Sequence, residues 1–137
     1  MKNSIFFMFS LFLSLISYGC DNAAEMRLQN SQNITKINVG MTKAEVLQIM
    51  GNKTAHKDSI TITNPFKTAL RQSDGNTYEI LYYYTHYLQH DYPFKSFIVR
   101  ESELTPIIFQ DGKVIGWGSD FLARTFPSEI TPRSRRQ

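Results

Sequence analysis

The sequence predicts an α+β fold in which two short N-terminal helices pack on a three- or four-stranded antiparallel sheet, as a two-layer sandwich. Three observations predict it: a short helix with both ends marked at residues 42–50, a long alternating strand at residues 77–88, and two turns centred on Asp-Gly. Helices come first and strands joined by hairpins follow, which favours helices packed on one antiparallel sheet. A chain of 137 residues has room for one domain.

The helix at residues 42–50 carries its own start and stop signals. Thr42 fits the N-cap, and Glu45 lies at the position from which its carboxylate can reach back to the Thr42 amide, forming a capping box. Met41 and Val46 are spaced as a hydrophobic staple, and Gly51 supplies a C-cap. About two turns of helix are too few to be stable alone, so the apolar side must pack on a sheet or another helix.

The strands are predicted from alternating polar and apolar residues and from the turns between them. The segment 77–88 places Tyr78, Ile80, Tyr82 and Tyr84 on one face, which is the expected core face. Asn64-Pro65 marks an edge or a bulge, and Trp117 between two glycines predicts a ring lying flat across backbone. Phe121, Leu122 and Phe126 predict a short terminal turn. The expected strands are residues 59–63, 66–70, 77–88, 104–109 and 113–118.

Residues 1–19 are typical of a secretion signal, and Cys20 follows as the only cysteine of the chain. Lys2 precedes an apolar run that is short for a membrane-spanning helix. The Gly19-Cys20 junction is similar to a bacterial lipoprotein processing site, although Ser17 stands where such signals usually carry leucine. We therefore expect lipidation of Cys20, the alternative being a free thiol. Asp21 resembles an inner-membrane retention signal of enteric bacteria, and the choice of membrane stays open.

Residues 20–33 are expected to be a lipid anchor and spacer, and residues 34–126 the folded domain. Ile34 and Ile37 are one helical turn apart, which predicts that the second half of the stretch 22–38 is the first helix. Residues 127–137 are expected to be a basic, solvated tail, with contact to anionic headgroups as the minority alternative. Without Lys2 the chain has 14 basic and 12 acidic side chains, so it is close to neutral and a nucleic-acid partner is not expected.

Three segments together resemble small bacterial lipoproteins with a BamE-like (SmpA/OmlA-type) domain, and most closely an uncharacterised lipoprotein family of that fold. They are residues 40–46 with Gly51, the strand ending in Tyr82-Tyr83-Tyr84, and residues 104–118. The resemblance covers roughly residues 34–118. It implies two short helices on a three- or four-stranded antiparallel sheet, tethered to a membrane and acting as a scaffold or binding module.

No catalytic, metal-binding or cofactor-binding constellation is evident. His86 and His90 are four apart, a spacing that suits a metal on a helix, but they fall at a strand end and in a loop. A pocket lined by His86, His90 and Asp91 would be the one arrangement to favour an enzyme. We expect no enzyme, no cofactor, no metal and no small-molecule substrate.

The surplus of tyrosine provides the candidate partner-binding surface, namely Tyr83, Tyr87 and Trp117. Only alternate residues of a strand can face the core, and tyrosine and tryptophan are enriched at binding hot spots. The alternative is that these rings merely cover the far face of the sheet. The sequence-based hypothesis is a lipid-anchored, periplasm-facing scaffold that binds an envelope protein through its sheet face or edge; the alternative is an inhibitor of an envelope or secreted enzyme.

Overall fold

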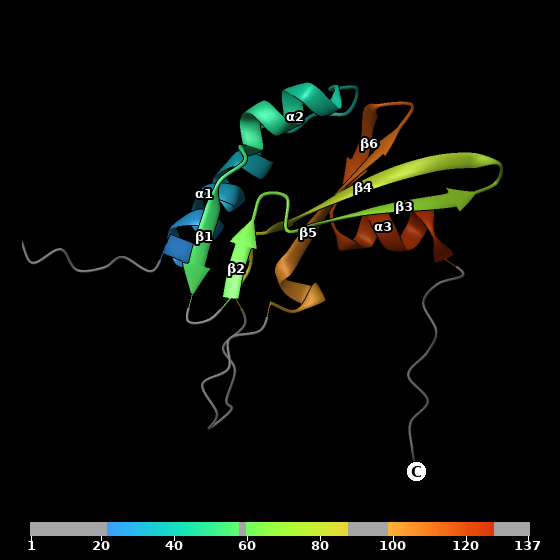
Figure 1. The fold of residues 1–137 in the computed structure, drawn as a ribbon. Coiled ribbons are helices and arrows are strands. Elements are labelled where there is room, and N and C mark those ends of the chain that lie inside the picture. Colours follow the sequence, from blue (N-terminus) through green and yellow to red (C-terminus); the bar gives the residue numbers. More distant parts are fainter. Residues whose placement is uncertain (1–21, 58–59, 88–98, 128–137) are drawn as a thin grey trace, which may run out of the picture.

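The computed structural model describes residues 22–57, 60–87 and 99–127. Three helices and six strands form an α+β fold with helices packed on a sheet, which confirms the predicted fold class (Figure 1). In chain order the elements are α1 (Asn22–Ile34), α2 (Lys43–Met50), β1 (Thr54–Lys57), β2 (Ile60–Thr63), β3 (Lys67–Ser73), β4 (Asn76–Tyr84), η1 (Glu101–Glu103), β5 (Leu104–Gln110), β6 (Lys113–Trp117) and α3 (Ser119–Thr125).

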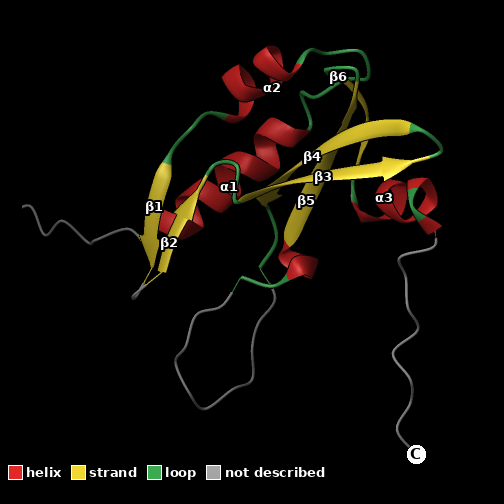
Figure 2. Ribbon diagram, turned by 45° about the vertical axis from the view of Figure 1, so that its right-hand side comes forward, coloured by secondary structure: helices red, strands yellow, loops and turns green. Residues whose placement is uncertain are grey.

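The main sheet is antiparallel with the order β3-β4-β5-β6, and β1 and β2 form a separate two-stranded hairpin (Figure 2). The two predicted Asp-Gly turns join β3 to β4 and β5 to β6. Asp74-Gly75 and Asp111-Gly112 all have positive φ, the conformation that two-residue hairpin turns with the right twist require. β1 was not expected from the sequence, and the peptide bond of Asn64-Pro65, after β2, is cis.

Both faces of the main sheet are buried, whereas the sequence predicted a core on one face. The α2 face carries Leu81, Tyr83, Ile107 and Phe109, which pack with Val46 and Met50 of α2 among others. The α3 face is covered by α3, α1 and the small hairpin, and α2 and α3 lie on opposite sides of β3 and β4 in both views (Figures 1 and 2). The core residues of the α3 face are Ile80, Tyr82, Tyr84, Leu104 and Ile108, with Ala23, Met26, Ala55, Ile62 and Phe126 above them.

The spacer predicted for residues 20–33 is wrong for all its described residues, because α1 begins at Asn22 and packs into the domain. Asn30, which is buried, donates to Asn64 Oδ1 and to the Tyr84 carbonyl, each at 2.9 Å. Asn64 donates in return to Asn30 Oδ1 at 2.7 Å and to the Met50 carbonyl at 3.1 Å. These paired amides connect α1 to α2 and β4, which offsets the poor helix propensity of asparagine. Ile37 is buried as expected, but it lies after the helix.

The ends of α2 agree with the sequence. Thr42 Oγ1 accepts from the Glu45 amide at 3.3 Å, and the Thr42 amide donates to Glu45 Oε2 at 2.7 Å. The Thr42 amide and, after it, the Thr42 hydroxyl lower the pKa of the Glu45 carboxyl, because both donate to its charged form. The Gly51 amide closes the helix on the Leu47 carbonyl at 2.9 Å.

The predicted terminal turn is the helix α3, and it lies against Gly116 of β6. A Cβ atom at Gly116 would fall 2.5 Å from the Phe121 ring, so the aromatic ring that lies on glycine is Phe121 rather than Trp117. Trp117 is 37% exposed. Phe126, just after α3, meets Tyr78 edge-on, with the ring centroids 5.2 Å apart. These contacts hold α3 against the sheet.

Gly116→Ala should lower the free energy of unfolding by about 1–3 kcal/mol, because the added methyl group must push Phe121 off the sheet. Urea titration followed by circular dichroism measures the change. The matched control is the same substitution in a Phe121→Ala background, where it should cost less than about 0.5 kcal/mol. An equal cost in both backgrounds would contradict the contact.

Candidate functional site

The two edges of the main sheet differ, and the difference defines the candidate site. The outer edge of β6 is paired with the segment 40–43 that leads into α2. The Gly40 amide donates to the Val114 carbonyl and the Val114 amide to the Met41 carbonyl, both at 2.8 Å. The Lys43 amide adds a bond of 3.1 Å to the Gly112 carbonyl. This edge is closed by the chain itself.

The outer edge of β3 has no strand beside it among the described residues. Ser73 and Asn76 flank a two-residue turn, and residues in that position form a hydrogen-bonded pair. Hydrogen-bonded and non-hydrogen-bonded pairs alternate along an antiparallel ladder, so every second residue of β3 directs its N–H and C=O groups away from β4. Those residues are Thr68, Leu70 and Gln72.

Side chains on β3 divide between the two faces of the sheet. Leu70, on the α2 face, is 72% exposed, the highest value among the large apolar side chains of the described residues. Its cross-strand neighbour Glu79 is bound by Lys43 Nζ at 2.5 Å. α2 buries the inner part of this face over Leu81 and Tyr83, and Leu70 stands outside the area that it covers.

The α3 face of β3 carries two cations that lie over aromatic rings. Lys67 Nζ is 4.3 Å from the centroid of the Tyr82 ring and is paired with Glu101. The guanidinium carbon of Arg71 is 5.5 Å from the centroid of the Phe126 ring. Stacking of this kind holds a long side chain in place and contributes about 0.5–1 kcal/mol at an exposed site. Strand β3 therefore carries an exposed apolar side chain on one face and two basic side chains stacked on aromatic rings on the other, of which Lys67 is ion-paired with Glu101.

Of the three residues predicted for the binding surface, Tyr83 is not on the surface, and its prediction is wrong. It is fully buried under α2, because both faces of β4 are covered, and cannot contact a partner. Tyr87 and Trp117 are 51% and 37% exposed. They have different neighbours: Lys57 Nζ lies 5.7 Å from the centroid of the Tyr87 ring, whereas Trp117 pairs with Ile107 at the end of β6. The structure does not bring the predicted set together.

The Tyr83 hydroxyl has no hydrogen-bond partner among the residues that the structure describes, and it is shielded from solvent. Its burial raises the pKa of the phenol to about 12, because the charged form would be desolvated. A buried hydroxyl without a partner costs free energy.

A cluster of polar side chains that the sequence did not reveal lies where β4 meets β5. Thr85 Oγ1 is 2.6 Å from Thr105 Oγ1 and 2.7 Å from His86 Nδ1. Glu103, also buried, accepts from the Arg100 amide at 2.8 Å, and its carbonyl accepts from the Thr85 and His86 amides, each at 3.0 Å. The two threonine hydroxyls are buried, so the cluster fastens the strand ends instead of exposing a nucleophile.

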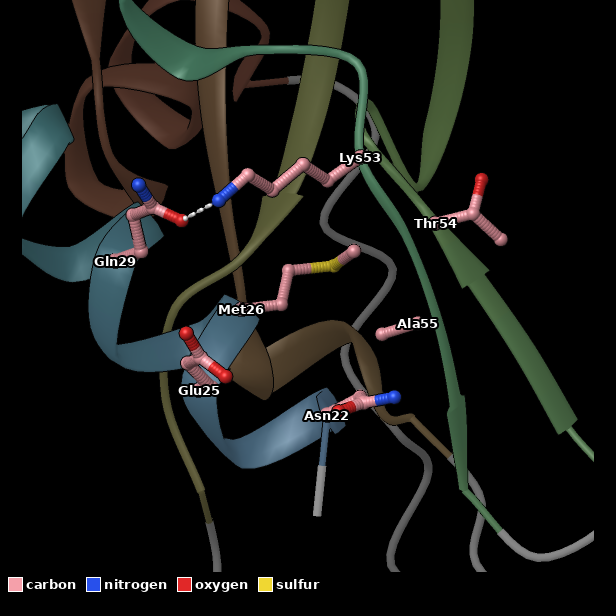
Figure 3. Close-up of a pocket in the computed structure, with 7 residues that line it drawn as sticks. All are labelled: Asn22, Glu25, Met26, Gln29, Lys53, Thr54 and Ala55. Atoms are coloured by element: carbon pink, nitrogen blue, oxygen red, sulfur yellow. Dashed lines mark hydrogen bonds between the residues drawn. The ribbon is translucent and has the colours of Figure 1, made fainter. Parts of the chain in front are cut away.

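A shallow pocket of about 170 Å³ lies between α1 and β1 (Figure 3). Met26 and Ala55 form its apolar floor, and Lys53 Nζ crosses the rim to donate to Gln29 Oε1 at 2.7 Å. Cofactor and drug-sized ligands occupy pockets of roughly 300–1,000 Å³.

The described residues also contain no group of three or more His, Cys, Asp or Glu side chains placed to hold a metal.

Several predicted positions lie outside the described residues. They are the leader at residues 1–19, Cys20, Asp21, His90, Asp91 and, beyond Pro127, the basic tail. In the part of the chain that the structure describes, no helix is long and apolar enough to cross a membrane.

A protein-family model described as "Protein of unknown function (DUF3192)" matches residues 20–124. The chain belongs to the DUF3192 family. The DUF3192 match begins at Cys20 and extends through α1 and all six strands into α3, so it covers both edges of the main sheet. No curated protein and no solved structure matches the chain.

In this DUF3192 protein, Tyr83→Phe should raise the free energy of unfolding by about 1 kcal/mol, because it removes a buried hydroxyl without a partner and keeps the ring. The matched control is Thr105→Val, which removes a buried hydroxyl that does have a partner and should be destabilising by about 1–2 kcal/mol. Urea titration at neutral pH measures both. A loss of stability in Tyr83→Phe would contradict the inference that the buried Tyr83 hydroxyl lacks a hydrogen-bond partner.

The same pair of proteins should diverge further at high pH. The Tyr83 pKa rises from 10.0 to about 12 on folding, so between these values the unfolded chain releases the proton first and stability is lost as the pH rises. Wild type should lose up to about 2–3 kcal/mol more than Tyr83→Phe between about pH 9 and pH 12. All other tyrosines are common to both proteins and cancel in the comparison.

Proposed function

We propose that this protein is a non-enzymatic protein-binding module of the bacterial envelope that takes up an extended segment of a partner protein at the edge of β3. One observation carries the proposal: the chain closes the β6 edge with its own residues 40–43, whereas among the described residues no strand pairs with the outer edge of β3. Unpaired strand edges are templates for strand addition, and soluble proteins normally cover or blunt them. The outer edge of β3, a strand of seven residues, is therefore a candidate site for an added strand from a partner protein.

Strand addition suits the rest of the surface. Main-chain hydrogen bonds to Thr68, Leu70 and Gln72 would supply affinity, and side chains on the two faces would supply selectivity. Both broad faces of the sheet are already covered by helices, so a partner meets the sheet from the side. The exposed side chain of Leu70 would be buried beside the incoming strand, which stabilises a complex by about 25 cal/mol per Å² of apolar surface removed from water.

The place of action is proposed from the N-terminal sequence. Residues 1–19 are typical of a secretion signal and the junction with Cys20 is similar to a lipoprotein processing site. The family match begins at Cys20, where the leader is proposed to end. A lipid on Cys20 would tether the domain by α1, which starts two residues later, and the domain would face the periplasm.

The anchor is tested by mass spectrometry of the mature N-terminus in bacteria that express the full-length gene. We expect cleavage before Cys20 and a mass increase from a thioether-linked diacylglycerol and an amide-linked acyl chain. Cys20→Ser should move the protein from the membrane fraction to the soluble fraction, with Ser17→Ala as the matched control that stays in the membrane. An intact leader, or an unmodified Cys20 at the N-terminus, would contradict the anchor.

The binding edge is tested by placing a photo-crosslinking amino acid at Thr68 in the full-length protein, in living cells. We expect a discrete crosslinked species from Thr68 and none from Gln48, which is also exposed, on α2. Leu70→Pro should abolish the species, since it removes an outward N–H that the β4 ladder does not use.

A circular dichroism spectrum and a urea midpoint for Leu70→Pro show whether the variant remains folded; Leu70→Lys is a second blocking variant that keeps the backbone N–H. Crosslinking that persists in both folded variants, or that is equal at Thr68 and Gln48, would count against strand addition at β3.

A further inference from the structure

The side chains that β3 carries on the α2 face of the sheet are all uncharged. They are Thr68, Leu70 and Gln72, and all three are exposed, because α2 packs over the inner strands. We call them the Leu70 surface. The same three residues direct their N–H and C=O groups outward. A strand added at this edge would therefore form its main-chain hydrogen bonds with residues whose side chains lie on an uncharged face.

The basic side chains of β3 are on the opposite face and are held there. Lys67 is ion-paired with Glu101 and lies over the ring of Tyr82, in the neighbouring strand β4. Arg71 lies over the ring of Phe126. Charged side chains, lysine above all, commonly protect an edge strand from pairing with other chains. Here both basic side chains are turned toward rings on the α3 face, so they do not protect the Leu70 surface.

One side of α2 borders the Leu70 surface. Lys43 Nζ binds Glu79, the cross-strand neighbour of Leu70, at 2.5 Å, which places this side of the helix beside Leu70. Leu47 is one turn further along the same side of α2 and is 37% exposed. Because Lys43 and Glu79 are bound to each other, the border combines an apolar side chain with an ion pair that has no net charge.

We propose that the segment taken up at β3 is an uncharged, apolar strand whose side chains on the α2 face pack on Leu70 and Leu47. This inference rests on the proposed function. Leu70 is 72% exposed, so it offers apolar surface that a valine, isoleucine or leucine of the added strand would remove from water. A charged side chain of either sign would lose hydration there, and the charges that border the surface are already bound to each other.

A second copy of this chain fits the Leu70 surface less well. Antiparallel pairing centred on Leu70 would place the two leucines opposite each other and Thr68 opposite Gln72, so one of the three positions on this face would be apolar. A partner strand with aliphatic residues at all three positions would bury more apolar area with the same main-chain hydrogen bonds. We therefore favour an apolar partner strand.

The test uses four seven-residue peptides that differ only at alternate positions, which are all valine, all threonine, all glutamate or all lysine. The intervening positions are threonine throughout. Valine and threonine are both β-branched and both favour strands, so they differ chiefly in apolar surface. Each peptide carries the same fluorophore, and its binding to the full-length protein in detergent micelles is measured by fluorescence anisotropy.

We expect the valine peptide to bind about three- to ten-fold more tightly than the threonine peptide, because its methyl groups are removed from water. The glutamate and lysine peptides should both bind more weakly than the threonine peptide. The preference for valine should persist at high salt, which screens charges. Tightest binding by the glutamate or the lysine peptide would overturn the inference.

Leu70→Thr should bring the valine and threonine peptides within about two-fold of each other, while it keeps the backbone N–H and the strand propensity. Leu47→Gln should reduce the preference in the same direction. The matched control is Leu28→Gln, which removes a leucine that is 54% exposed on α1 and should leave the preference unchanged. Empty micelles measure the binding of each peptide to detergent, which is the same for every variant. Urea midpoints show that the variants are folded.

Amide hydrogen exchange with and without peptide separates this inference from the proposed function. We expect new protection at Thr68, Leu70 and Gln72. If all four peptides protect these amides equally, or if the preference for valine survives Leu70→Thr, strand addition stands and the apolar segment is overturned. If no peptide protects them and Thr68 gives no crosslink in cells, both proposals fail. If the protein self-associates with rising concentration, and Leu70→Lys abolishes this, a second copy fills the edge and the apolar partner strand is overturned.

Discussion

The pairing of residues 40–43 with β6 is the interaction on which the rest of this structure depends. It closes one edge of the main sheet through main-chain bonds to Val114 and Gly112. It also fixes where α2 begins, because Thr42, which bridges to Lys113, is the N-cap of the helix. α2 must then run over Leu81, Tyr83 and Phe109. One short pairing thus closes an edge and covers a face, and in the part of the chain that the structure describes only the β3 edge of the main sheet has no segment paired with it.

Local signals explain why part of the fold could be predicted from sequence. The capping box of Thr42 and Glu45 and the two Asp-Gly turns involve residues within three or four positions of each other, so their geometry depends on the local sequence alone. α1 is different, because its buried asparagines are satisfied by Asn64 and the Tyr84 carbonyl, far along the chain. Without those partners, the sequence of α1 indicates a polar spacer. Burial of both faces of β4 has the same origin, since α2 covers one face and α1, the small hairpin and α3 cover the other, all from distant parts of the chain.

The sequence could predict that the sheet provides a binding surface, but not which residues form that surface. The sequence indicates a sheet with edges, and the excess of tyrosine indicates a surface, yet nothing in residues 67–73 says that this strand lies outermost. Tyr83 was assigned to the surface because alternation allows one buried face in a two-layer fold. Once a third layer is present, that rule no longer separates Tyr83 from Tyr82. Leu70 carried a usable signal: it is a large apolar residue, flanked by Ala69 and Arg71, in a strand that is otherwise polar on the same face.

The distance along the chain between Thr42 and Lys113 has a consequence for how the molecule is made. A ribosome releases the N-terminal segment first, and α2 has nothing to lie on until the last hairpin has emerged. Contacts between such remote segments are slow to form, because a long loop must close before they contribute. During synthesis, both edge strands of the main sheet therefore remain unpaired until residues 40–43 pair with β6. A chaperone that binds the nascent chain would meet two unpaired strand edges, whereas the described part of the folded molecule has one.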